Sequence, residues 1–490
     1  MRKFLLSAVF LFPLWIFGQS NLGLVWAPKV VVANGATYDN IRPQIAVVEG
    51  ELPLVLWCRS VGGRHGYVAR WNGTAFDAPF KINPTGGINA YNVEGPNIVA
   101  RGDTAYIVYV STPSSSAQVL LRSSFDGGQT WNAPQWVDSL STDMPTFANV
   151  EILPGGHPIV TYIRQTVNYA SPRWVVRKSN DAGQTWLPEV PVSGAAPGTD
   201  VCDCCTGHTY AHEGKVIEVF RNNDNNLRDF WATISTDGGA SFPTAVDLDT
   251  TDWTLAACPS SGSSSVLVGD TIYTAFMSQG SNGLARVWLG AAHLGTGQMA
   301  YNRMLNGNVP RNTIQNYVSM SGNGDTVVVA WMESSGGNPE ILLRYSFTGV
   351  ADLWTHPVVN VTELATGQQS FPDLLWKNGA VHLVWQDEAT NQVVYRRAEV
   401  GIPAGLGNAF EGSWTLYPNP AKDRVTLDAL PSADCTLSLM DIRGQLLSRM
   451  ELSHKHRAAL DLAGVKAGVY FLQLTSDGVH LGTKKLVVQR

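Results

Sequence analysis

Cysteine is the residue type whose spacing points most directly to chemistry in this sequence. Cys202, Cys204 and Cys205 lie within four consecutive positions, His208 follows three residues later, and Cys258 stands more than fifty residues further on. Thiolates and imidazoles are ligands that copper and zinc prefer, so these residues could hold a soft metal ion. Disulfides are the alternative, because thiols in exported chains are ordinarily oxidised. A bridge between the adjacent Cys204 and Cys205 would be strained, so Cys258 is an easier partner for Cys202 or Cys204.

The N-terminal sequence indicates the cellular compartment in which these thiols are located. An apolar run over residues 4–17 is preceded by Arg2 and Lys3, and we expect cleavage after Gly18. Residues 1–18 are therefore predicted to be a secretory signal peptide. The chain of 490 residues has a net charge of −6 and contains no basic runs, which argues against a nucleic-acid partner. We expect an exported monomer.

A repeated octapeptide organises the middle of the chain. The segment Ser-Phe-Asp-Gly-Gly-Gln-Thr-Trp at residues 124–131 recurs at residues 179–186 and, in weaker form, at residues 235–242, with spacings of 55 and 56 residues. Asp and Gly in such a segment form a tight hairpin turn, and the aromatic side chain packs beneath it. The S-x-D-x-G-x-T-W pattern resembles the Asp box (BNR repeat) of sialidase-like β-propellers. This resemblance implies a propeller.

A second periodic feature gives the number of repeats. Apolar strands carry an aromatic residue at seven positions that are 52 to 58 residues apart, namely Trp57, Tyr109, Tyr162, Phe220, Phe276, Trp331 and Trp385. The last repeat has no outer strand after it, whereas residues 25–32 read as an outer strand with nothing before it. Because a ring cannot leave strand edges unpaired, we expect the N-terminal strand to close the final blade. The predicted fold class is all-β, with a propeller over residues 19–411 that has seven blades, or six as the alternative.

Residues 412–490 have a different pattern. A Leu-Tyr-Pro-Asn-Pro-Ala segment at residues 416–421 is followed by alternating strands at residues 436–440 and 462–474. By composition this region is a small β-sandwich. It closely resembles the C-terminal sorting domain of the type IX secretion system of Bacteroidetes. The resemblance implies that the secretion machinery is a partner and that the protein is exported through the periplasm and outer membrane, to be secreted or held at the cell surface.

Charged residues interrupt the apolar pattern of one middle strand. Glu218 stands two positions before the repeated aromatic and Arg221 one position after it, where the other six repeats have uncharged residues. Because burial of an unpaired charge is costly, the two must pair with each other or serve a site. Arg228 is a weaker candidate of the same kind.

The repeat also places the two cysteine segments. Both lie at the beginning of an innermost strand, in the fourth and fifth repeats, where such segments converge on one face of a propeller. We therefore expect Cys202, Cys204, Cys205 and Cys258 to lie within bonding reach of one another.

The resemblance to sialidases implies a set of site residues. Sialidases bind the substrate carboxylate with three arginines and use a tyrosine nucleophile with a glutamate partner. Tyr317 has the position of the nucleophile, and Glu218 and Glu333 are the catalytic carboxylate candidates. The ligand-binding candidates are Arg42, whose Arg-Pro segment only partly matches the family pattern, Arg221 and Arg228. Four further arginines recur at one place in the repeat and are expected to be structural, namely Arg122, Arg177, Arg344 and Arg396.

Three functions stay open on these observations. The first is a secreted sialidase-like propeller that binds or processes a glycan or another extracellular ligand on its axial face; an enzyme of this kind would be a glycoside hydrolase resembling exo-α-sialidase. The second is a non-catalytic binding propeller, or one that holds copper or zinc at the cysteine and histidine cluster. The third is a structural surface protein.

Overall fold

The computed structural model divides into two compact units, one over Trp26–Ala398 and one that contains the chain after Glu399. The proposed signal peptide, residues 1–18, and the expected domain boundary at residues 411 and 412 lie outside the described residues. No helix in the described part of the chain is long and apolar enough to cross a membrane. The structure describes residues 23–35, 38–91, 93–138, 143–280, 283–363, 367–401, 414–428, 430, 435–452, 456–476 and 479–489.

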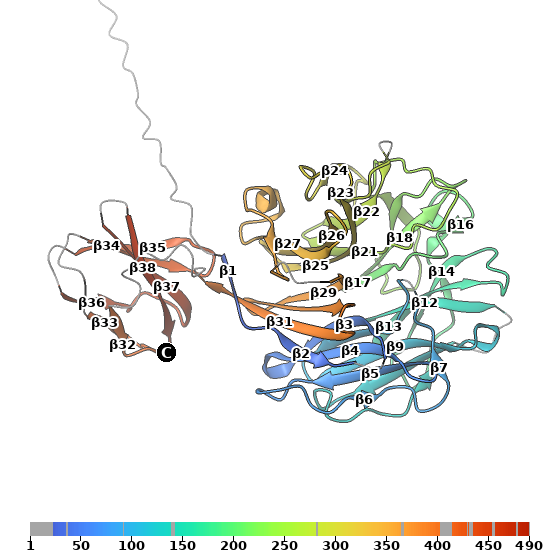
Figure 1. Ribbon diagram of the computed structural model, residues 1–490, viewed down its shortest axis with the longest axis horizontal. Helices are drawn as coiled ribbons and strands as arrows, with labels where there is room; N and C mark the ends of the chain where they lie inside the picture. The colour runs from blue at the N-terminus through green and yellow to red at the C-terminus, as the bar shows by residue number, and fades with distance from the viewer. Residues whose placement is uncertain are drawn as a thin grey trace, which may run out of the picture. The chain divides into compact units, whose positions relative to one another are not determined.

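Among the described residues of the first unit, seven antiparallel sheets follow one another in sequence, so the unit is a propeller with seven blades rather than six. Figure 1 shows innermost strands gathered around the middle of the propeller. Blades 1 to 7 begin with the innermost strands β3 (Asn40–Val48), β8 (Asn97–Arg101), β12 (Met144–Ile152), β17 (His208–His212), β21 (Ser263–Val268), β25 (Ile314–Asn323) and β29 (Gln369–Lys377).

The second strand of each blade carries the repeated aromatic residue, and all seven of these side chains are buried. Each fills the space between neighbouring sheets, where burial of a large apolar side chain contributes about 1.5–3 kcal/mol. The burial explains why the aromatic recurs although its type varies. These strands are β4 (Leu52–Ser60), β9 (Thr104–Thr112), β13 (Pro158–Gln165), β18 (Lys215–Asn223), β22 (Thr271–Ser278), β26 (Thr326–Ser334) and β30 (Ala380–Asp387).

The outer part of each blade is less regular. The third strands are β5 (Arg64–Arg70), β10 (Val119–Ser124), β14 (Arg173–Lys178), β19 (Phe230–Ser235), β23 (Arg286–His293), β27 (Pro339–Ser346) and β31 (Gln392–Gly401). The outermost strands of blades 1 to 6 are β6 (Phe80–Lys81), β11 (Gln135–Trp136), β15 (Val190–Pro191), β20 (Thr244–Asp247), β24 (Met299–Met304) and β28 (Val359–Asn360). Two short strands pair with second strands, β7 (Gly87–Ile88) with β9 and β16 (Asp200–Val201) with β18. Short 3-10 turns occupy Glu49–Glu51, Ser114–Ser116, Ser193–Ala195 and Val350–Trp354.

An arginine on the third strand ties four of the blades to the preceding blade. In each case the guanidinium donates to a backbone carbonyl of the preceding blade. The acceptor is the residue that directly follows the outermost strand of that preceding blade. A repeated bond of this kind holds neighbouring sheets together, so these arginines are structural, as the sequence predicts. The donors are Arg122, Arg177, Arg344 and Arg396, and the acceptors are Ile82, Val137, Leu305 and Val361 in that order.

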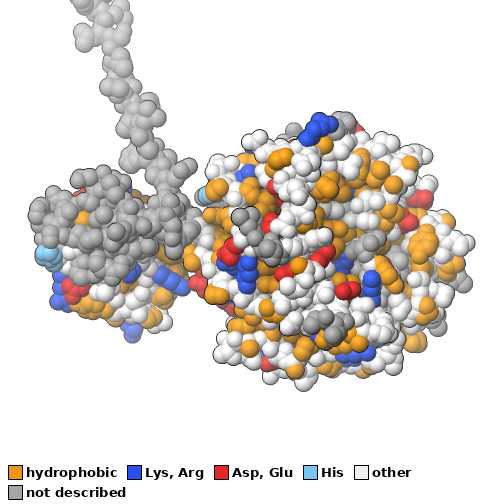
Figure 2. Space-filling view, in the orientation of Figure 1, with side chains coloured by type: hydrophobic (Ala, Val, Ile, Leu, Met, Phe, Trp, Pro, Cys, Tyr) orange, Lys and Arg blue, Asp and Glu red, His pale blue; other side chains and the backbone are white. Residues whose placement is uncertain are grey.

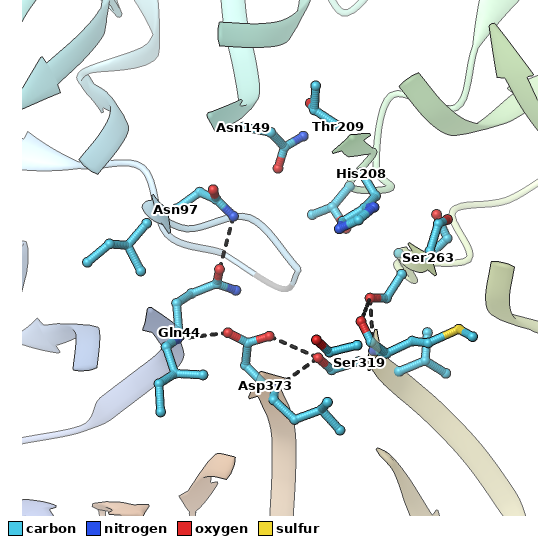
Figure 3. A pocket seen from close by; sticks show the side chains of 18 of the residues that line it. Gln44, Asn97, Asn149, His208, Thr209, Ser263, Ser319 and Asp373 are labelled. Atoms are coloured by element: carbon cyan, nitrogen blue, oxygen red, sulfur yellow. Dashed lines mark hydrogen bonds between the residues drawn. The ribbon is translucent and has the colours of Figure 1, made fainter. Parts of the chain in front are cut away.

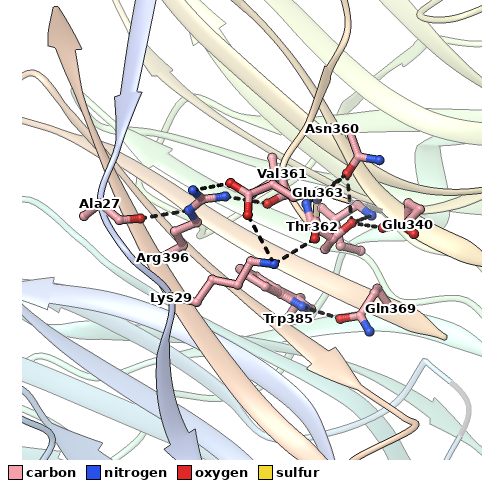
Figure 4. A network of polar contacts seen from close by, with 11 residues as sticks. Ala27, Lys29, Glu340, Asn360, Val361, Thr362, Glu363, Gln369, Trp385 and Arg396 are labelled. Atoms are coloured by element: carbon pink, nitrogen blue, oxygen red, sulfur yellow. Dashed lines mark hydrogen bonds and ion pairs between the residues drawn. The ribbon is translucent and has the colours of Figure 1, made fainter. Parts of the chain in front are cut away.

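The ring closes through the N-terminal strand β2 (Val30–Ala33), which pairs with β31 of the last blade, and β1 (Gly23–Trp26) lies in the same sheet. Figure 1 shows the blue β2 beside the orange β31. Figure 4 shows the polar contacts at this seam: Arg396 donates to the Ala27 carbonyl (2.9 Å) and to the Glu363 carboxylate (2.6 Å), and Lys29 donates to the Thr362 carbonyl (2.7 Å). The predicted closure of the final blade by the N-terminal strand is confirmed.

The three repeated octapeptides form the same hydrogen-bonded turn. At the second copy, Ser179 Oγ donates to Asp181 Oδ1 (2.7 Å), the Gly183 amide donates to Ser179 Oγ (2.8 Å), and Thr185 Oγ1 donates to Asp181 Oδ2 (2.5 Å). Gly183 has a φ of 89°, a conformation that glycine adopts readily. Hydrogen bonds from Thr185 and Ser179 to the carboxylate lower the pKa of Asp181 to about 2. These turns fix the outer loops of three blades.

The second unit consists of two sheets around one apolar core. One sheet contains β32 (Thr415–Tyr417), β33 (Arg424–Asp428) and β36 (Arg457–Asp461), and the other contains β34 (Cys435–Asp441), β35 (Leu446–Leu452), β37 (Gly468–Ser476) and β38 (Val479–Val488). Trp414, Val425, Leu437 and Leu472 are among the buried residues that they share. Two sheets over a common core form the small β-sandwich that the sequence predicts.

Candidate functional site

A cavity of about 440 Å³ follows the axis of the propeller, and every innermost strand contributes to its lining. On each of these strands one lining residue pairs with the residue just before the buried aromatic of the second strand. This axis-facing residue is polar in all seven blades, and Figure 3 shows most of the set around the cavity. From blade 1 to blade 7 the axis-facing residues are Gln44, Asn97, Asn149, His208, Ser264, Ser319 and Asp373.

The innermost strands of four blades contain a bulge two residues before the axis-facing position. At each bulge a residue other than glycine adopts a left-handed backbone: Arg42 (φ 59°), Phe147 (φ 54°), Tyr317 (φ 51°) and Phe371 (φ 50°). Such a conformation costs on the order of 1–3 kcal/mol per residue and is typical of functional sites. Bulges also redirect side chains. All four residues line one cavity, so the strain is concentrated at the axis.

Arg42, Tyr317 and Phe371 stack against one another in the cavity wall. The guanidinium carbon of Arg42 lies 3.8 Å from the centre of the Phe371 ring, and the Tyr317 and Phe371 rings are 3.9 Å apart. Burial lowers the pKa of Arg42 to about 9, so it is still a cation at neutral pH. Its Nη2 has no hydrogen-bond partner, and no carboxylate of the described residues forms an ion pair with it. The aromatic rings stabilise this cation, but they leave its hydrogen-bonding capacity free.

Glu94 supports the strained Phe147 from behind the wall. Its carboxylate accepts hydrogen bonds from the Phe147 amide (2.9 Å) and from Asn89 Nδ2 (2.8 Å). Burial raises the pKa of Glu94 to about 7, although both bonds oppose the shift. Glu94 is therefore a positioning residue for the bulge in blade 3.

The axis-facing side chains link most blades to the next one. Ser264 Oγ accepts from the Met320 amide (2.9 Å), Ser319 Oγ from the Leu374 amide (3.0 Å) and Asp373 Oδ2 from the Ile45 amide (2.8 Å). Gln44 accepts from Asn97 Nδ2 (3.0 Å), and Asn97 accepts from the Val150 amide (3.4 Å). Burial raises the pKa of Asp373 to about 6. These contacts form a relay that runs from blade 5 through blades 6, 7, 1 and 2 to blade 3.

The relay stops on both sides of blade 4. Within the described residues, Asn149 Nδ2, His208 Nδ1 and Ser263 Oγ have no hydrogen-bond partner, and all three residues line the cavity. Burial lowers the pKa of His208 to about 4, so the ring is neutral at physiological pH. Buried polar groups without a partner are rare in folded proteins. These groups are consequently available to a ligand.

The three proposed catalytic residues do not converge. Tyr317 lines the cavity, whereas Glu333 Oε2 accepts hydrogen bonds elsewhere, from Gln315 Nε2 (2.8 Å), Asn306 Nδ2 (2.9 Å) and Trp331 Nε1 (3.1 Å). These three donors hold the Glu333 carboxylate, which does not line the cavity with Tyr317.

Glu218 lies behind the cavity wall rather than in it. Its Oε2 accepts from Thr209 Oγ1 (2.7 Å), and its Oε1 has no partner and packs against Gly207, which leaves no room there for a Cβ. Burial raises the pKa of Glu218 to about 8. It forms no ion pair with Arg221 within the described structure, since strand residues three apart point to opposite faces. The expectation that these two charges might be mutually paired is wrong.

Two of the three proposed ligand-binding arginines also lie outside the cavity lining. Arg221 donates to the carbonyls of Arg228 (2.8 Å) and Met277 (2.6 Å), and Arg228 Nε donates to the Leu255 carbonyl (3.0 Å). Only Arg42 of the three lines the cavity.

The cysteines of blades 4 and 5 are brought together by the fold. Cys202 Sγ lies 3.2 Å from Cys205 Sγ and 3.5 Å from Cys204 Sγ, and Cys258 Sγ lies within 4.8 Å of Cys204 Sγ. No disulfide joins the four cysteines of these two blades. His208 belongs to neither group of potential metal ligands in the described part of the chain, because it lies on the axial strand β17 and lines the cavity. The expectation that His208 joins the thiols is therefore wrong.

Sequence reasoning missed most of the axis-facing residues. Their side chains differ in type from blade to blade, so no repeated letter marks them. The spacing does mark them, because each lies directly across from the residue before the repeated aromatic. Phe371 and Phe147 could have been found in the same way, two residues earlier in the strand.

The C-terminal unit matches a known family, described as the secretion system C-terminal sorting domain, over residues 415–489. None of the curated proteins matches the sequence. A protein of unknown function from Dyadobacter fermentans is similar in structure at 10% identity, over 78% of this chain and 100% of that chain, with a TM-score of 0.46. An ulvan lyase of polysaccharide lyase family PL25 is similar at 11% identity, over 77% of this chain and 96% of that chain, with a TM-score of 0.49.

The sialidase of Trypanosoma rangeli is also similar, at 12% identity, over 93% of this chain and 88% of that chain, with a TM-score of 0.44. At these identities the likeness concerns the fold alone. Residues 415–489, by contrast, match the sorting-domain family directly, and such domains direct export through the type IX system. The chain is accordingly a seven-bladed β-propeller protein with a C-terminal type IX sorting domain, exported to the cell surface or the extracellular space.

Proposed function

We propose that the propeller binds an anionic extracellular ligand, with acidic glycans as the ligand class, in its axial cavity. The observation that carries the proposal is the Arg42 guanidinium, which is 8% exposed, has an unpartnered Nη2 and faces the cavity from a strained backbone. A buried cation without a carboxylate partner is costly unless an anion completes its site. A carboxylate or sulfate group suits a guanidinium because it can accept two parallel hydrogen bonds.

The rest of the cavity supports a polyhydroxylated ligand. Asn149 Nδ2, His208 Nδ1 and Ser263 Oγ have unused hydrogen-bonding capacity on the side opposite the relay, and Tyr317 contributes an aromatic side chain to the lining. A cavity of about 440 Å³ lies within the range of small-molecule sites. On the face that Figure 2 shows, Lys and Arg side chains lie in small groups beside Asp and Glu side chains. Selection of an anion therefore depends on Arg42 rather than on a broad basic surface.

Binding is favoured over glycoside hydrolysis. A sialidase uses a tyrosine nucleophile with a glutamate partner, but neither glutamate candidate, Glu218 or Glu333, lines the cavity with Tyr317. The two carboxylates that line the cavity are held by backbone amides: Asp373 accepts from the Ile45 amide (2.8 Å) and Glu151 accepts from the Ile152 amide (2.7 Å). Tyr317 has a pKa raised by burial, and the carboxylate whose charge raises it further is Glu388.

The test is calorimetric titration of the purified protein with acidic oligosaccharides and with neutral oligosaccharides of the same size. Acidic ligands should bind, and Arg42→Gln should weaken their binding by about tenfold or more, which corresponds to about 1.4 kcal/mol. Arg173→Gln, which removes a partly exposed arginine outside the cavity, is the matched control and should leave the affinity unchanged. Equal binding of neutral and acidic ligands, or an unaffected Arg42→Gln variant, contradicts the proposal. Turnover of a fluorogenic sialoside that disappears in Tyr317→Phe would instead identify an enzyme.

A further inference from the structure

The four cysteines of blades 4 and 5 form a compact sulfur cluster that does not line the axial cavity. Cys202 Sγ is nearly equidistant from Cys205 Sγ (3.2 Å) and Cys204 Sγ (3.5 Å). Cys204 also belongs to a second group, in which its Sγ, Cys258 Sγ and a carboxylate oxygen of Asp203 all lie within 4.8 Å of one another. Cys202 and Cys205 are buried, and Cys258 is exposed. The cluster thus has a buried end and an end open to solvent.

The sulfur separations are close to those of thiolates on a single metal ion. A zinc–sulfur bond is about 2.3 Å long, so two sulfurs on one tetrahedral or trigonal ion lie roughly 4 Å apart. Small rotations of the side chains would bring the observed 3.2 Å and 3.5 Å separations to that value. The exposed Cys258 gives the cluster an access route.

Two buried arginines place positive charge beside the sulfurs. The Cys202 amide donates to the backbone carbonyl of Arg221 (3.0 Å), and the side chains of Arg221 and Arg228 are almost fully buried. Arg221 Nε and Arg228 Nη1 have no hydrogen-bond partner, and neither arginine forms an ion pair with any described carboxylate. Asp203 and Asp249 interact electrostatically with Arg228 and Arg221, but neither forms an ion pair with them among the described residues. The two cations can therefore balance further negative charge. This observation is independent of the sulfur geometry.

We propose that Cys202, Cys204 and Cys205, joined by Cys258, bind one thiophilic d10 metal ion, Cu(I) or Zn(II). Each thiol would release its proton to solvent on binding. Three or four thiolates around such an ion leave a net negative charge, which Arg221 and Arg228 would balance. Two disulfides, Cys202 to Cys205 and Cys204 to Cys258, would be neutral and would place no further negative charge near the two guanidinium groups. The charge environment therefore favours the metal site over the disulfides.

The test is titration of the reduced, full-length protein with Cu(I) and, separately, with Zn(II), each in competition with a chromophoric chelator. One of the two ions should bind at about one equivalent per chain, with the ultraviolet charge-transfer absorption of a metal thiolate and protection of the cluster from alkylation. The ion that binds more tightly in these two titrations is identified as the metal of the site. Cys205→Ser should lower the stoichiometry to near zero, and Cys58→Ala, which removes a buried cysteine outside the cluster, should leave it unchanged.

Two results would overturn the proposal. One is that the reduced wild-type protein retains neither ion against the chelator. The other is that mass spectrometry of the unreduced exported protein finds the cluster cysteines in disulfides without bound metal. If Cys205→Ser does not fold, the wild-type absorption and alkylation data still decide the question. Because the cluster lies outside the cavity lining, these results are separate from the effect of Arg42→Gln on ligand binding.

Discussion

The part of the axis around blade 4 differs from the rest of the ring in the hydrogen bonds that its polar side chains form. Elsewhere the axis-facing side chains accept hydrogen bonds from the following blade, as Ser319 does from the Leu374 amide and Asp373 from the Ile45 amide. On either side of blade 4 the corresponding groups, Asn149 Nδ2 and His208 Nδ1, have no partner in the described structure. Along the rest of the ring these side chains connect neighbouring blades, whereas Asn149 of blade 3 and His208 of blade 4 each keep a polar group without a partner in the described residues.

Blade 4 also contains buried charges that the repeat does not explain. Glu218, Arg221 and Arg228 belong to it, and three of the clustered cysteines precede its innermost strand. Blades 3 and 4 are linked instead by a buried chain of hydroxyl and carboxyl groups, in which Thr161 Oγ1 lies 2.7 Å from Thr209 Oγ1. Blade 4 thus combines buried charges with clustered thiols, whereas the relay residues of the other blades connect the ring.

The largest expected effect comes from opening the ring at its seam. Deletion of residues 23–34 removes β1 and β2, exposes the edge of β31 and breaks the contacts of Arg396 and Lys29 shown in Figure 4. We expect the variant to unfold or aggregate, as size-exclusion chromatography and thermal melting would show. Deletion of residues 414–490 is the control, because the propeller core is a separate compact unit and should keep its melting transition. An unchanged transition in the first variant would mean that the ring does not depend on this strand.

The next largest effect separates relay residues from unpartnered ones. Asp373→Ala removes an acceptor from the Ile45 amide and from Ser319 Oγ and should destabilise the propeller by about 2–3 kcal/mol. Asn149→Ala removes an axis-facing residue whose Nδ2 has no partner and should cost less than about 1 kcal/mol. Urea denaturation of both variants measures the two costs. Similar losses would show that an unpartnered axial residue beside blade 4 does not differ in its contribution to stability from a relay residue.

A third prediction uses the buried carboxyl group of blade 4. Burial raises the pKa of Glu218 to about 8, above its unfolded value of 4.5, so the folded state holds a proton that the unfolded state has lost between these values. The stability that this proton provides is complete below pH 4.5 and is lost as the pH rises towards 8. The free energy of unfolding should therefore fall with rising pH across this window, by up to about 1.4 kcal/mol per pH unit from this group.

Glu218→Gln should reduce that slope. Part of the slope should remain in this variant, because burial also raises the pKa values of Glu94 and Glu151 to about 7. Glu213→Gln, in the exposed turn before β18, is the matched control and should retain the wild-type slope. The measurement is urea denaturation at several pH values between about 4.5 and 8. A slope that Glu218→Gln leaves unaltered would place the responsible groups outside blade 4.

The sequence predicted the features that every repeat shares and missed those that depend on one loop or one strand face. The seven aromatics and the closing strand follow from periodicity, and the meeting of Cys258 with Cys204 follows from the register of adjacent blades. The surroundings of Glu333 could not be predicted, because its donors Asn306 and Gln315 come from a loop and from the start of β25. The separation of Glu218 from Arg221 was predictable in principle, since side chains alternate along a strand.

The smallest effect concerns two serines of the cavity wall that share chemistry and burial. Ser319 is 4% exposed and Ser263 is 8% exposed, and both line the cavity. Ser319 Oγ donates to Asp373 Oδ1 (2.9 Å) and accepts from the Leu374 amide (3.0 Å), whereas Ser263 Oγ has no partner among the described residues. Ser319→Ala should therefore cost about 1 kcal/mol, and Ser263→Ala should be neutral or slightly stabilising, because removing an unpartnered hydroxyl loses no hydrogen bond.

Of the two serine substitutions, the one with the smaller effect on stability should have the larger effect on ligand affinity. Ser263 Oγ has no partner among the described residues and could bond to a ligand in the cavity. In that case Ser263→Ala should weaken binding of the acidic oligosaccharide while leaving the urea midpoint unchanged. Ser319→Ala should lower the midpoint and affect binding less, since its hydroxyl is already engaged by Asp373 and the Leu374 amide. The pair thus separates a group that holds the ring from one that is available to a ligand, at nearly equal burial. Equal effects of the two substitutions on both stability and binding would remove the distinction between relay residues and unpartnered residues of the cavity wall.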